Sequence, residues 1–167
     1  NLLASLNGQI LTHHGQPEVV KPWLAKLVRG DALLAIALTE PRGGSDAGNL
    51  RLRVERVTGG NGEHYIVNGE KTSISAADQA DATVVFGRTG TVESQAHGVT
   101  ALLVPMDLPG VTTNRFDCHG QRAIGRGSIF FENVRVPVER RLGDENKGFV
   151  QVLQGFVFSR ALIGLQV

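Results

Sequence analysis

The chain has 167 residues, enough for one domain whose core buries roughly 70% of the unfolded surface. Its 17 Lys and Arg balance 16 Asp and Glu, so bulk charge favours neither a nucleic-acid partner nor a membrane surface. The single cysteine, Cys118, allows no internal disulfide and fits a reducing compartment. No apolar run reaches the roughly 18–20 residues that span a bilayer, so we expect no membrane span and an intracellular location.

Helical spacing predicts the first elements, from residue 1 to about 30. Pro17 suits a first helical turn, and Gly30 is placed to end that helix. From about 33 to 137 the pattern changes to strands, and from about 144 it becomes helical again. We expect strands at 33–39, 50–57, 63–67, 71–75, 82–88, 99–104 and 128–136.

Glycine-rich turns separate these expected strands. Asn68-Gly69 is a good two-residue hairpin turn because both residues tolerate positive φ, and Pro109-Gly110 marks another turn. Many short strands joined by such turns are typical of a small antiparallel barrel or sandwich. The sequence therefore predicts an α+β protein, with an antiparallel β-barrel or sandwich between helical segments.

The last segment, 149–165, is apolar on nearly every face of a helix. A helix of that kind is buried on all sides, and one small domain cannot bury it alone. We therefore expect the chain to be a piece of a longer protein.

The segment most informative about function runs from Leu38 to Asp46, with the sequence LTEPRGGSD. A buried strand ends at the hydroxyl residue Thr39, and Pro41 then turns the chain. Two glycines let the backbone approach a ligand closely, and Ser45 helps to complete a loop of N–H and O–H donors. Such a loop can hold a polar ring edge or a phosphate; an ordinary turn between strands is the alternative.

Five motifs follow one another along the chain: TEP at 39–41, GSD at 44–46, NGEK at 68–71, FENVRVP at 131–137 and LGDENKGF at 142–149. Together they resemble the middle β-barrel domain of one family, the acyl-CoA dehydrogenases. The resemblance covers essentially the whole chain. It implies the end of an N-terminal helical domain at 1–32, the barrel at 33–140 and the start of a C-terminal helical domain at 141–167. The flanking helices then come from truncated all-α domains.

The same resemblance implies that the barrel holds the flavin ring of FAD without a Rossmann fold, in agreement with the lack of a G-x-G-x-x-G motif. The FAD contacts that it implies are Leu38, Thr39, Ser45, Ser73, Ile74 and Ser75. Ser45 matches a serine near the FAD pyrophosphate or the acyl-CoA substrate. Ser75 keeps a hydroxyl near the reactive edge of the flavin, whereas Ser73 stands where the family usually has tryptophan.

The reaction implied is α,β-dehydrogenation of an acyl-CoA thioester. A carboxylate removes the α-proton while the β-hydrogen passes as hydride to the flavin. One of the family's two positions for that base matches Ser159, which cannot act as a general base by itself, and the other lies beyond Val167. We therefore expect no catalytic base in this chain, and no activity from the chain alone. Arg160 either orients the substrate or braces its helix.

Ser73 in place of tryptophan leaves the electron acceptor open between an electron-transferring flavoprotein and oxygen. An acyl-CoA oxidase or a flavin monooxygenase on the same fold is thus one alternative. A non-catalytic barrel that binds acyl-CoA or a protein is another, because the base is missing. We also expect a homo-oligomer in the full-length protein and no metal site. The expected location is the cytoplasm of a bacterium, or the mitochondrial matrix of a eukaryote.

Overall fold

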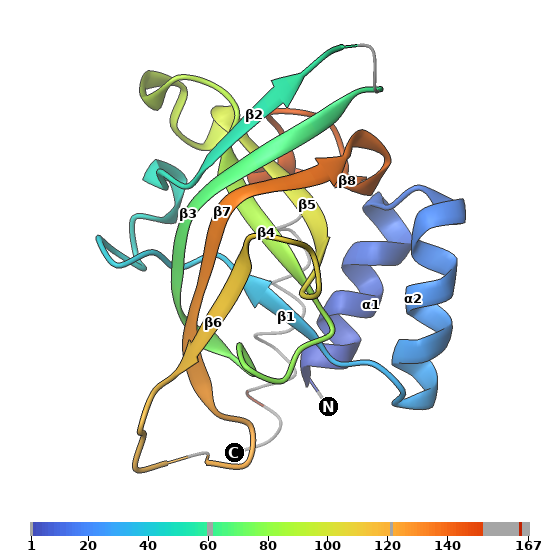
Figure 1. Ribbon diagram of the computed structural model, residues 1–167, viewed down its shortest axis with the longest axis vertical. Coiled ribbons are helices and arrows are strands. Elements are labelled where there is room, and N and C mark those ends of the chain that lie inside the picture. The colour runs from blue at the N-terminus through green and yellow to red at the C-terminus, as the bar shows by residue number, and fades with distance from the viewer. Residues whose placement is uncertain (1, 60–61, 121, 152–163, 165–167) are drawn as a thin grey trace.

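A computed structural model describes residues 2–59, 62–120, 122–151 and 164. Eight strands form one strongly curved sheet, and two helices pack against one side of it (Figure 1). This arrangement confirms the α+β fold class predicted from the sequence. The apolar segment at 149–165 lies largely outside the described residues.

The two helices are α1 (Leu2–His14) and α2 (Pro17–Arg29). Pro17 opens α2, where its missing N–H has no helical partner to lose. Gly30 ends the helix in the left-handed region, with φ 78°, and its N–H donates to the carbonyl of Leu27. Both signals act as the sequence predicts.

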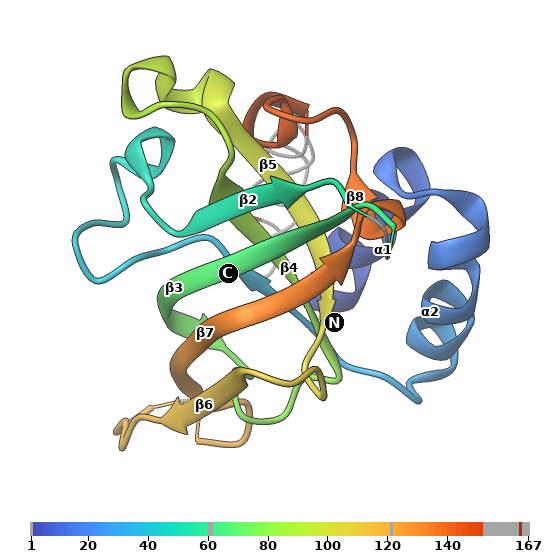
Figure 2. The ribbon, with the colours of Figure 1, turned by 45° about the horizontal axis from the view of Figure 1, so that its top comes forward.

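The strands run in the sheet order β6-β7-β3-β2-β4-β5-β8, and β1 pairs with β4 off this path (Figure 2). Their bounds are β1 (Leu34–Ala37), β2 (Arg53–Val57), β3 (His64–Ser75), β4 (Ala82–Arg88), β5 (Val99–Pro105), β6 (Val111–Arg115), β7 (Arg126–Pro137) and β8 (Arg141–Leu142). Short 3-10 helices are η1 (Ala47–Asn49), η2 (Val92–Gly98) and η3 (Val138–Arg140). Most pairs are antiparallel, but β1 runs parallel to β4.

The core has two parts, separated by β4 and β5. Val84 and Phe86 face the helices and pack with Leu11, whereas Val85 faces the barrel interior and packs with Tyr65. Every residue of β4 and β5 is buried. That is why these two strands read as continuous apolar runs instead of alternating ones.

The prediction of a hairpin turn at Asn68-Gly69 is wrong, because β3 is one 12-residue strand that runs through both residues. The positive φ expected there is present only at Gly69, at 135°, and the pair lies at a register shift against β7. The amide of Asn68 bonds across to Asn133, accepting from its backbone N–H at 2.8 Å. Asn-Gly therefore forms a bulge in a continuous strand.

Candidate functional site

The end of β1 meets the second half of β3. The backbone N–H of Thr72 donates to the carbonyl of Thr39 at 2.9 Å. Thr39 therefore lies beside Thr72, three residues before Ser75 along β3. The structure thus brings together two motifs that are far apart in the sequence.

A bulge shapes β3 at this point. Lys71 pairs with Ile129 and Ile74 pairs with Gly127, so Thr72 and Ser73 together face the single residue between those partners. Ser73 takes a left-handed backbone conformation, with φ 56°. Non-glycine residues in this region are uncommon and are strained by of order 1–3 kcal/mol.

The three predicted contacts of this strand differ in accessibility. Ser73 is exposed and Ser75 is half-buried. The side chain of Ile74 is 3% exposed and belongs to the barrel core. Only the backbone of Ile74 is therefore available to a ligand.

A buried ion pair lies directly behind this junction. The ammonium of Lys71, whose side chain is fully buried, lies 2.8 Å from Oε1 of Glu40 and donates to the carbonyl of Leu38 at 3.0 Å. The Glu40 carboxylate also accepts from the backbone N–H groups of Arg51 and Leu52, at 2.7 and 2.8 Å. One pair thus ties the end of β1 to β3 and to the segment leading into β2.

Both members of the pair have shifted pKa values. Burial acts to raise the pKa of Glu40, but the charge and hydrogen bond of Lys71 and the two backbone donors outweigh it, so the pKa is lowered. Burial lowers the pKa of Lys71 to about 8, although Glu40 opposes the shift. At neutral pH the two groups therefore form an ion pair.

Ser45 lies on an exposed loop next to Thr39. A side-chain carbon built at Gly44 would lie 3.5 Å from the methyl group of Thr39, and one at Gly43 would meet nothing within 4 Å. A cavity of about 390 Å³ opens against this loop, lined in part by Glu40, Arg42 and Asp46. The loop is therefore close to the Thr39 junction and open to a ligand.

These features fit the polar edge of a flavin. Ser73 is exposed, whereas Thr39 and Ser75 are half-buried, and each of the three carries a hydroxyl group. The backbone at Gly43 and Gly44 leaves room for close approach, as a phosphate or a polar ring edge requires. The donor set suits FAD, while the contacts of the individual residues stay predictions.

Sequence reasoning assigned no role to Glu40, Lys71 or Arg88. Each is a charged residue within or beside a strand expected to be buried, which is the signal that could have identified them. Two predicted positions, Ser159 and Arg160, lie outside the described residues.

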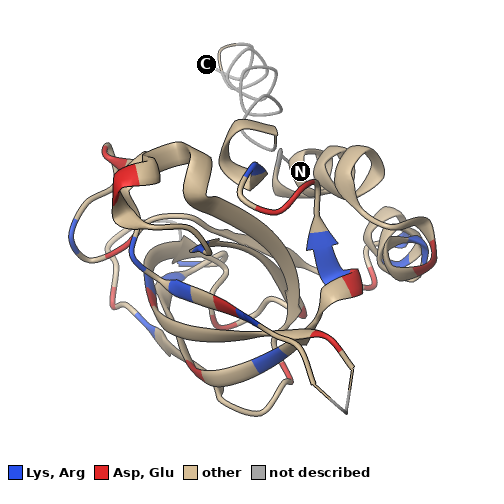
Figure 3. Ribbon diagram, turned by 90° about the horizontal axis from the view of Figure 1, so that it is seen from above, with Lys and Arg blue, Asp and Glu red and all other residues tan. Residues whose placement is uncertain are grey.

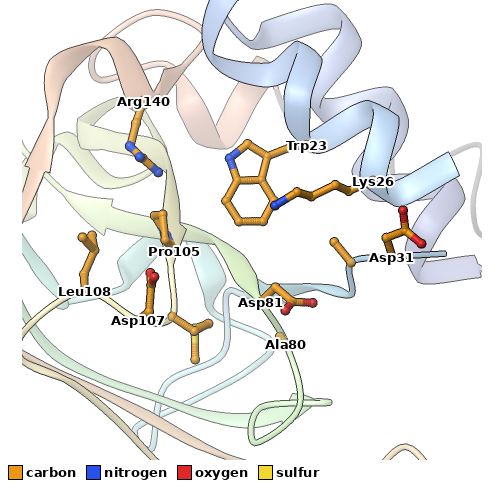
Figure 4. A pocket seen from close by; sticks show the side chains of 11 residues that line it. Trp23, Lys26, Asp31, Ala80, Asp81, Pro105, Asp107, Leu108 and Arg140 are labelled. Atoms are coloured by element: carbon orange, nitrogen blue, oxygen red, sulfur yellow. The ribbon is translucent and has the colours of Figure 1, made fainter. Parts of the chain in front are cut away.

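Another cavity, of about 660 Å³, lies between α2 and the barrel (Figure 4). Lys26 lies 5.5 Å from the centre of the Trp23 ring there, and Arg140 and Asp107 also line the cavity. It adjoins Ala32 and Ala80, before β1 and β4 begin, whereas Thr39 follows the other end of β1. The motifs at Thr39 and Ser75 therefore do not line this cavity.

Basic and acidic residues are interspersed along the ribbon, and neither sign predominates in this view (Figure 3). Within the part of the chain that the structure describes, no three or more His, Cys, Asp or Glu side chains gather as a metal site. No helix of that part is long and apolar enough to cross a membrane.

Known proteins share the sequence and the fold of this chain. A family model described as "Acyl-CoA dehydrogenase, middle domain" matches residues 35–134. A probable acyl-CoA dehydrogenase of Bacillus subtilis, YngJ, is 39% identical over 150 residues, which cover 89% of this chain and 38% of that protein.

Solved structures give the same result. Butyryl-CoA dehydrogenase from Megasphaera elsdenii superposes with a TM-score of 0.83 at 31% identity, over 93% of this chain and 40% of that one. A glutaryl-CoA dehydrogenase from Mycobacterium smegmatis in complex with FADH2 gives 0.81 at 30% identity, over 93% and 38%. The chain spans little more than a third of the curated relatives that it matches. The chain belongs to the acyl-CoA dehydrogenase family, in which residues 35–134 correspond to the middle domain.

Proposed function

We propose that this chain is the flavin-binding part of an FAD-dependent acyl-CoA dehydrogenase, which introduces an α,β double bond into an acyl-CoA thioester. The observation that carries the proposal is the backbone bond from Thr72 to Thr39, which aligns two family motifs at one edge of the barrel. The M. smegmatis relative was solved with FADH2, which supports the choice of cofactor.

The residues of this chain serve to hold and orient the cofactor. FAD, when bound, supplies the acceptor for the substrate's β-hydrogen. Thr39 and Leu38 meet the flavin edge with backbone groups and a hydroxyl, from the end of β1. Ser73, Ile74 and Ser75 meet it from β3.

The hydroxyl of Ser75 is the group that we place nearest the reactive edge of the flavin. Ser45 lies where it can contact the FAD pyrophosphate or acyl-CoA, on a loop that is exposed and close to Thr39. Both hydroxyls contribute hydrogen bonds worth about 0.5–1.5 kcal/mol each.

The catalytic base comes from outside this chain. Ser159 occupies one of the two family positions for the base and has no acidic side chain. We propose that residues 1–32 and 141–167 belong to helical domains on either side of the barrel at 33–140, and that the carboxylate lies on the C-terminal one. Arg160 is then a residue that can orient the substrate.

Membership of the family supports a proposal for the partners and the location. We propose acyl-CoA as the substrate, a homo-oligomer as the assembly, and an electron-transferring flavoprotein as the acceptor. Relatives include a Bacillus protein and mitochondrial enzymes such as isovaleryl-CoA dehydrogenase of Pongo abelii. The bacterial cytoplasm or the mitochondrial matrix is the corresponding location.

One observation favours a second candidate, an acyl-CoA oxidase. The small side chain of Ser73 is exposed at the position where the family usually carries tryptophan, so it shields the flavin less. Reoxidation of the reduced full-length protein by air alone, at the rate of turnover, supports the oxidase. Reoxidation that needs an electron-transferring flavoprotein supports the dehydrogenase.

Replacement of Ser75 by alanine in the full-length protein tests the site. We expect a shifted flavin absorbance spectrum and redox potential and a slower turnover, because one hydrogen bond to the flavin is lost. Ser5→Ala, at an exposed position of α1, is the control and leaves all three unchanged. A Ser75→Ala protein with the wild-type spectrum, potential and turnover contradicts the assignment.

A further inference from the structure

Arg88, the last residue of β4, connects two loops. Its guanidinium donates to the carbonyls of Gly48 and Leu50, at 2.8 and 3.0 Å. It also donates to those of Thr91 and Gln95, at 3.2 and 2.6 Å. The first two belong to the segment 43–50, which we call the Ser45 loop. The other two belong to the segment 91–98, which contains η2 and which we call the 91–98 loop.

The environment of Arg88 is unusual for an arginine. The residue is 7% exposed, and its four acceptors are all neutral carbonyl groups. Burial lowers the pKa of Arg88, while Glu40 and Glu93 oppose the shift from a distance. Burial of a cation without a bonded carboxylate is costly. Because all four acceptors are neutral, the rigid guanidinium fork holds the two loops by directional hydrogen bonds and does not neutralise a charge.

The 91–98 loop is shaped around this guanidinium. Gln95 has φ 46° and ψ −126°, a conformation that glycine adopts readily and other residues seldom adopt, and its carbonyl accepts the shortest of the four bonds. A side-chain carbon at Gly98 would lie 2.9 Å from Nη1 of Arg88. One at Gly48 would lie 3.7 Å from Cβ of Ala96, so the two loops also touch each other.

We propose that Arg88 is a positioning residue for acyl-CoA binding, which joins the Ser45 loop and the 91–98 loop into one rigid unit. This inference rests on the proposed function and takes acyl-CoA, not the FAD pyrophosphate, as the contact of Ser45. Arg88 lies behind the loops and acts through them. Its loss therefore weakens substrate binding and leaves the flavin junction at Thr39 and Ser75 in place.

Steady-state kinetics of the full-length protein separate this role from a general structural one. For Arg88→Lys, which keeps the charge but loses the fork, we expect the KM for acyl-CoA to rise about tenfold. The kcat and the bound FAD stay within about twofold of wild type. Arg53→Lys, on an exposed pair with Glu55, is the matched control and changes neither constant. An unchanged KM, or a kcat and FAD content that fall together with the rise in KM, overturns the proposal.

Gln95 provides a second pair of variants that leave Arg88 intact. Gln95→Gly accepts the observed backbone conformation and keeps the carbonyl in place, so KM stays at the wild-type value. Gln95→Val strains the same conformation and turns the carbonyl away, so KM rises. Equal KM values for the two variants overturn the proposal. This test remains decisive if the Arg88→Lys protein does not fold.

Hydrogen exchange measures the loop coupling without any assay of activity. In Arg88→Lys we expect faster exchange in peptides covering 43–50 and 91–98 together, and unchanged exchange in β5. Faster exchange in one loop alone overturns the coupling. A wild-type protein without flavin or acyl-CoA turnover contradicts the proposed function, whereas the exchange result still decides whether Arg88 joins the loops.

Discussion

Lys71 and Glu40, which are 31 residues apart in the sequence, form a buried ion pair with 2.8 Å between Nζ and Oε1. The same ammonium bonds the carbonyl of Leu38, next to Thr39, and Lys71 itself precedes the bulge that carries Ser73. The two segments that we assign to the flavin are therefore fixed to each other from behind by this pair.

Removal of the carboxylate should destabilise the protein strongly. Glu40→Gln leaves the Lys71 ammonium buried without a counter-charge, and the new amide presents its NH₂ group to backbone donors. We expect a loss of about 3–5 kcal/mol in the free energy of unfolding, measured with urea. The double variant Glu40→Gln/Lys71→Met should lose less than the sum of the single variants, because no charge is left buried.

The exposed pair of Arg53 and Glu55 provides the control for that experiment. Their side chains are 71% and 56% exposed, so replacement of either should change stability by less than about 1 kcal/mol. A Glu40→Gln variant that loses no more than this control would show that the buried pair does not stabilise the junction.

The lowered pKa of Lys71 predicts a pH dependence. Burial brings the pKa of Lys71 from 10.5 to about 8 in the folded protein. Between these two values the unfolded chain binds more protons than the folded one, so this group makes the protein more stable as pH rises through that window. Below about pH 8 the lysine is protonated in both states and its contribution is constant.

Comparison with Lys71→Met isolates that contribution from all other titrations. The difference in unfolding free energy, wild type minus variant, should increase between pH 8 and about 10 and stay flat between pH 6 and 7. Urea titrations at each pH measure it. A difference that falls over the upper range is incompatible with the buried position of Lys71.

The left-handed conformation of Ser73 predicts opposite effects for two substitutions. Ser73→Gly relieves the strain at φ 56°, so stability should stay level or rise by up to about 1 kcal/mol. Ser73→Val should lose about 1–3 kcal/mol, since a β-branched residue tolerates this region poorly. Thermal unfolding of both variants measures the two stabilities. Equal stability would contradict the left-handed conformation of Ser73 in the bulge.

Local patterns predicted the elements that are apolar or clearly capped. Pro17 and Gly30 marked α2, and the continuous apolar runs gave β4 and β5 almost to the residue. β6 was missed because it lies at the sheet edge with four of its five residues exposed, so no alternation marks it. The prediction of a hairpin turn at Asn68-Gly69 was wrong because a bulge and a hairpin both require a residue that tolerates positive φ, so the sequence does not distinguish them.

The candidate site was predictable only in part. The motifs around Thr39 and Ser75 were recognisable one by one, and resemblance to a family placed them on one ligand. Their contact depends on a backbone bond from Thr72 and on the Glu40–Lys71 pair, both across more than 30 residues. Pairing between residues so far apart in the sequence is set by how the sheet closes. The local periodicity of the sequence carries no information on that closure.

Pairing of the missed strand β6 with β7 can be tested at Gly127. A side-chain carbon there would overlap the carbonyl oxygen of Asn114, so Gly127→Ala must push the two strands apart. We expect a loss of about 1–3 kcal/mol in stability. Gly120→Ala, where nothing lies within 4 Å, is the control and should change little. Equal stability of the two variants contradicts the observed pairing.

We propose that the junction of Thr39 with β3 belongs to a flavin site used for acyl-CoA oxidation. The most direct measurement is the absorbance of the purified full-length protein between about 350 and 500 nm, before and after acyl-CoA is added under argon. We expect bound flavin whose bands bleach on addition of acyl-CoA, because hydride passes to the ring. A colourless protein, or bound flavin that acyl-CoA does not reduce, would contradict it.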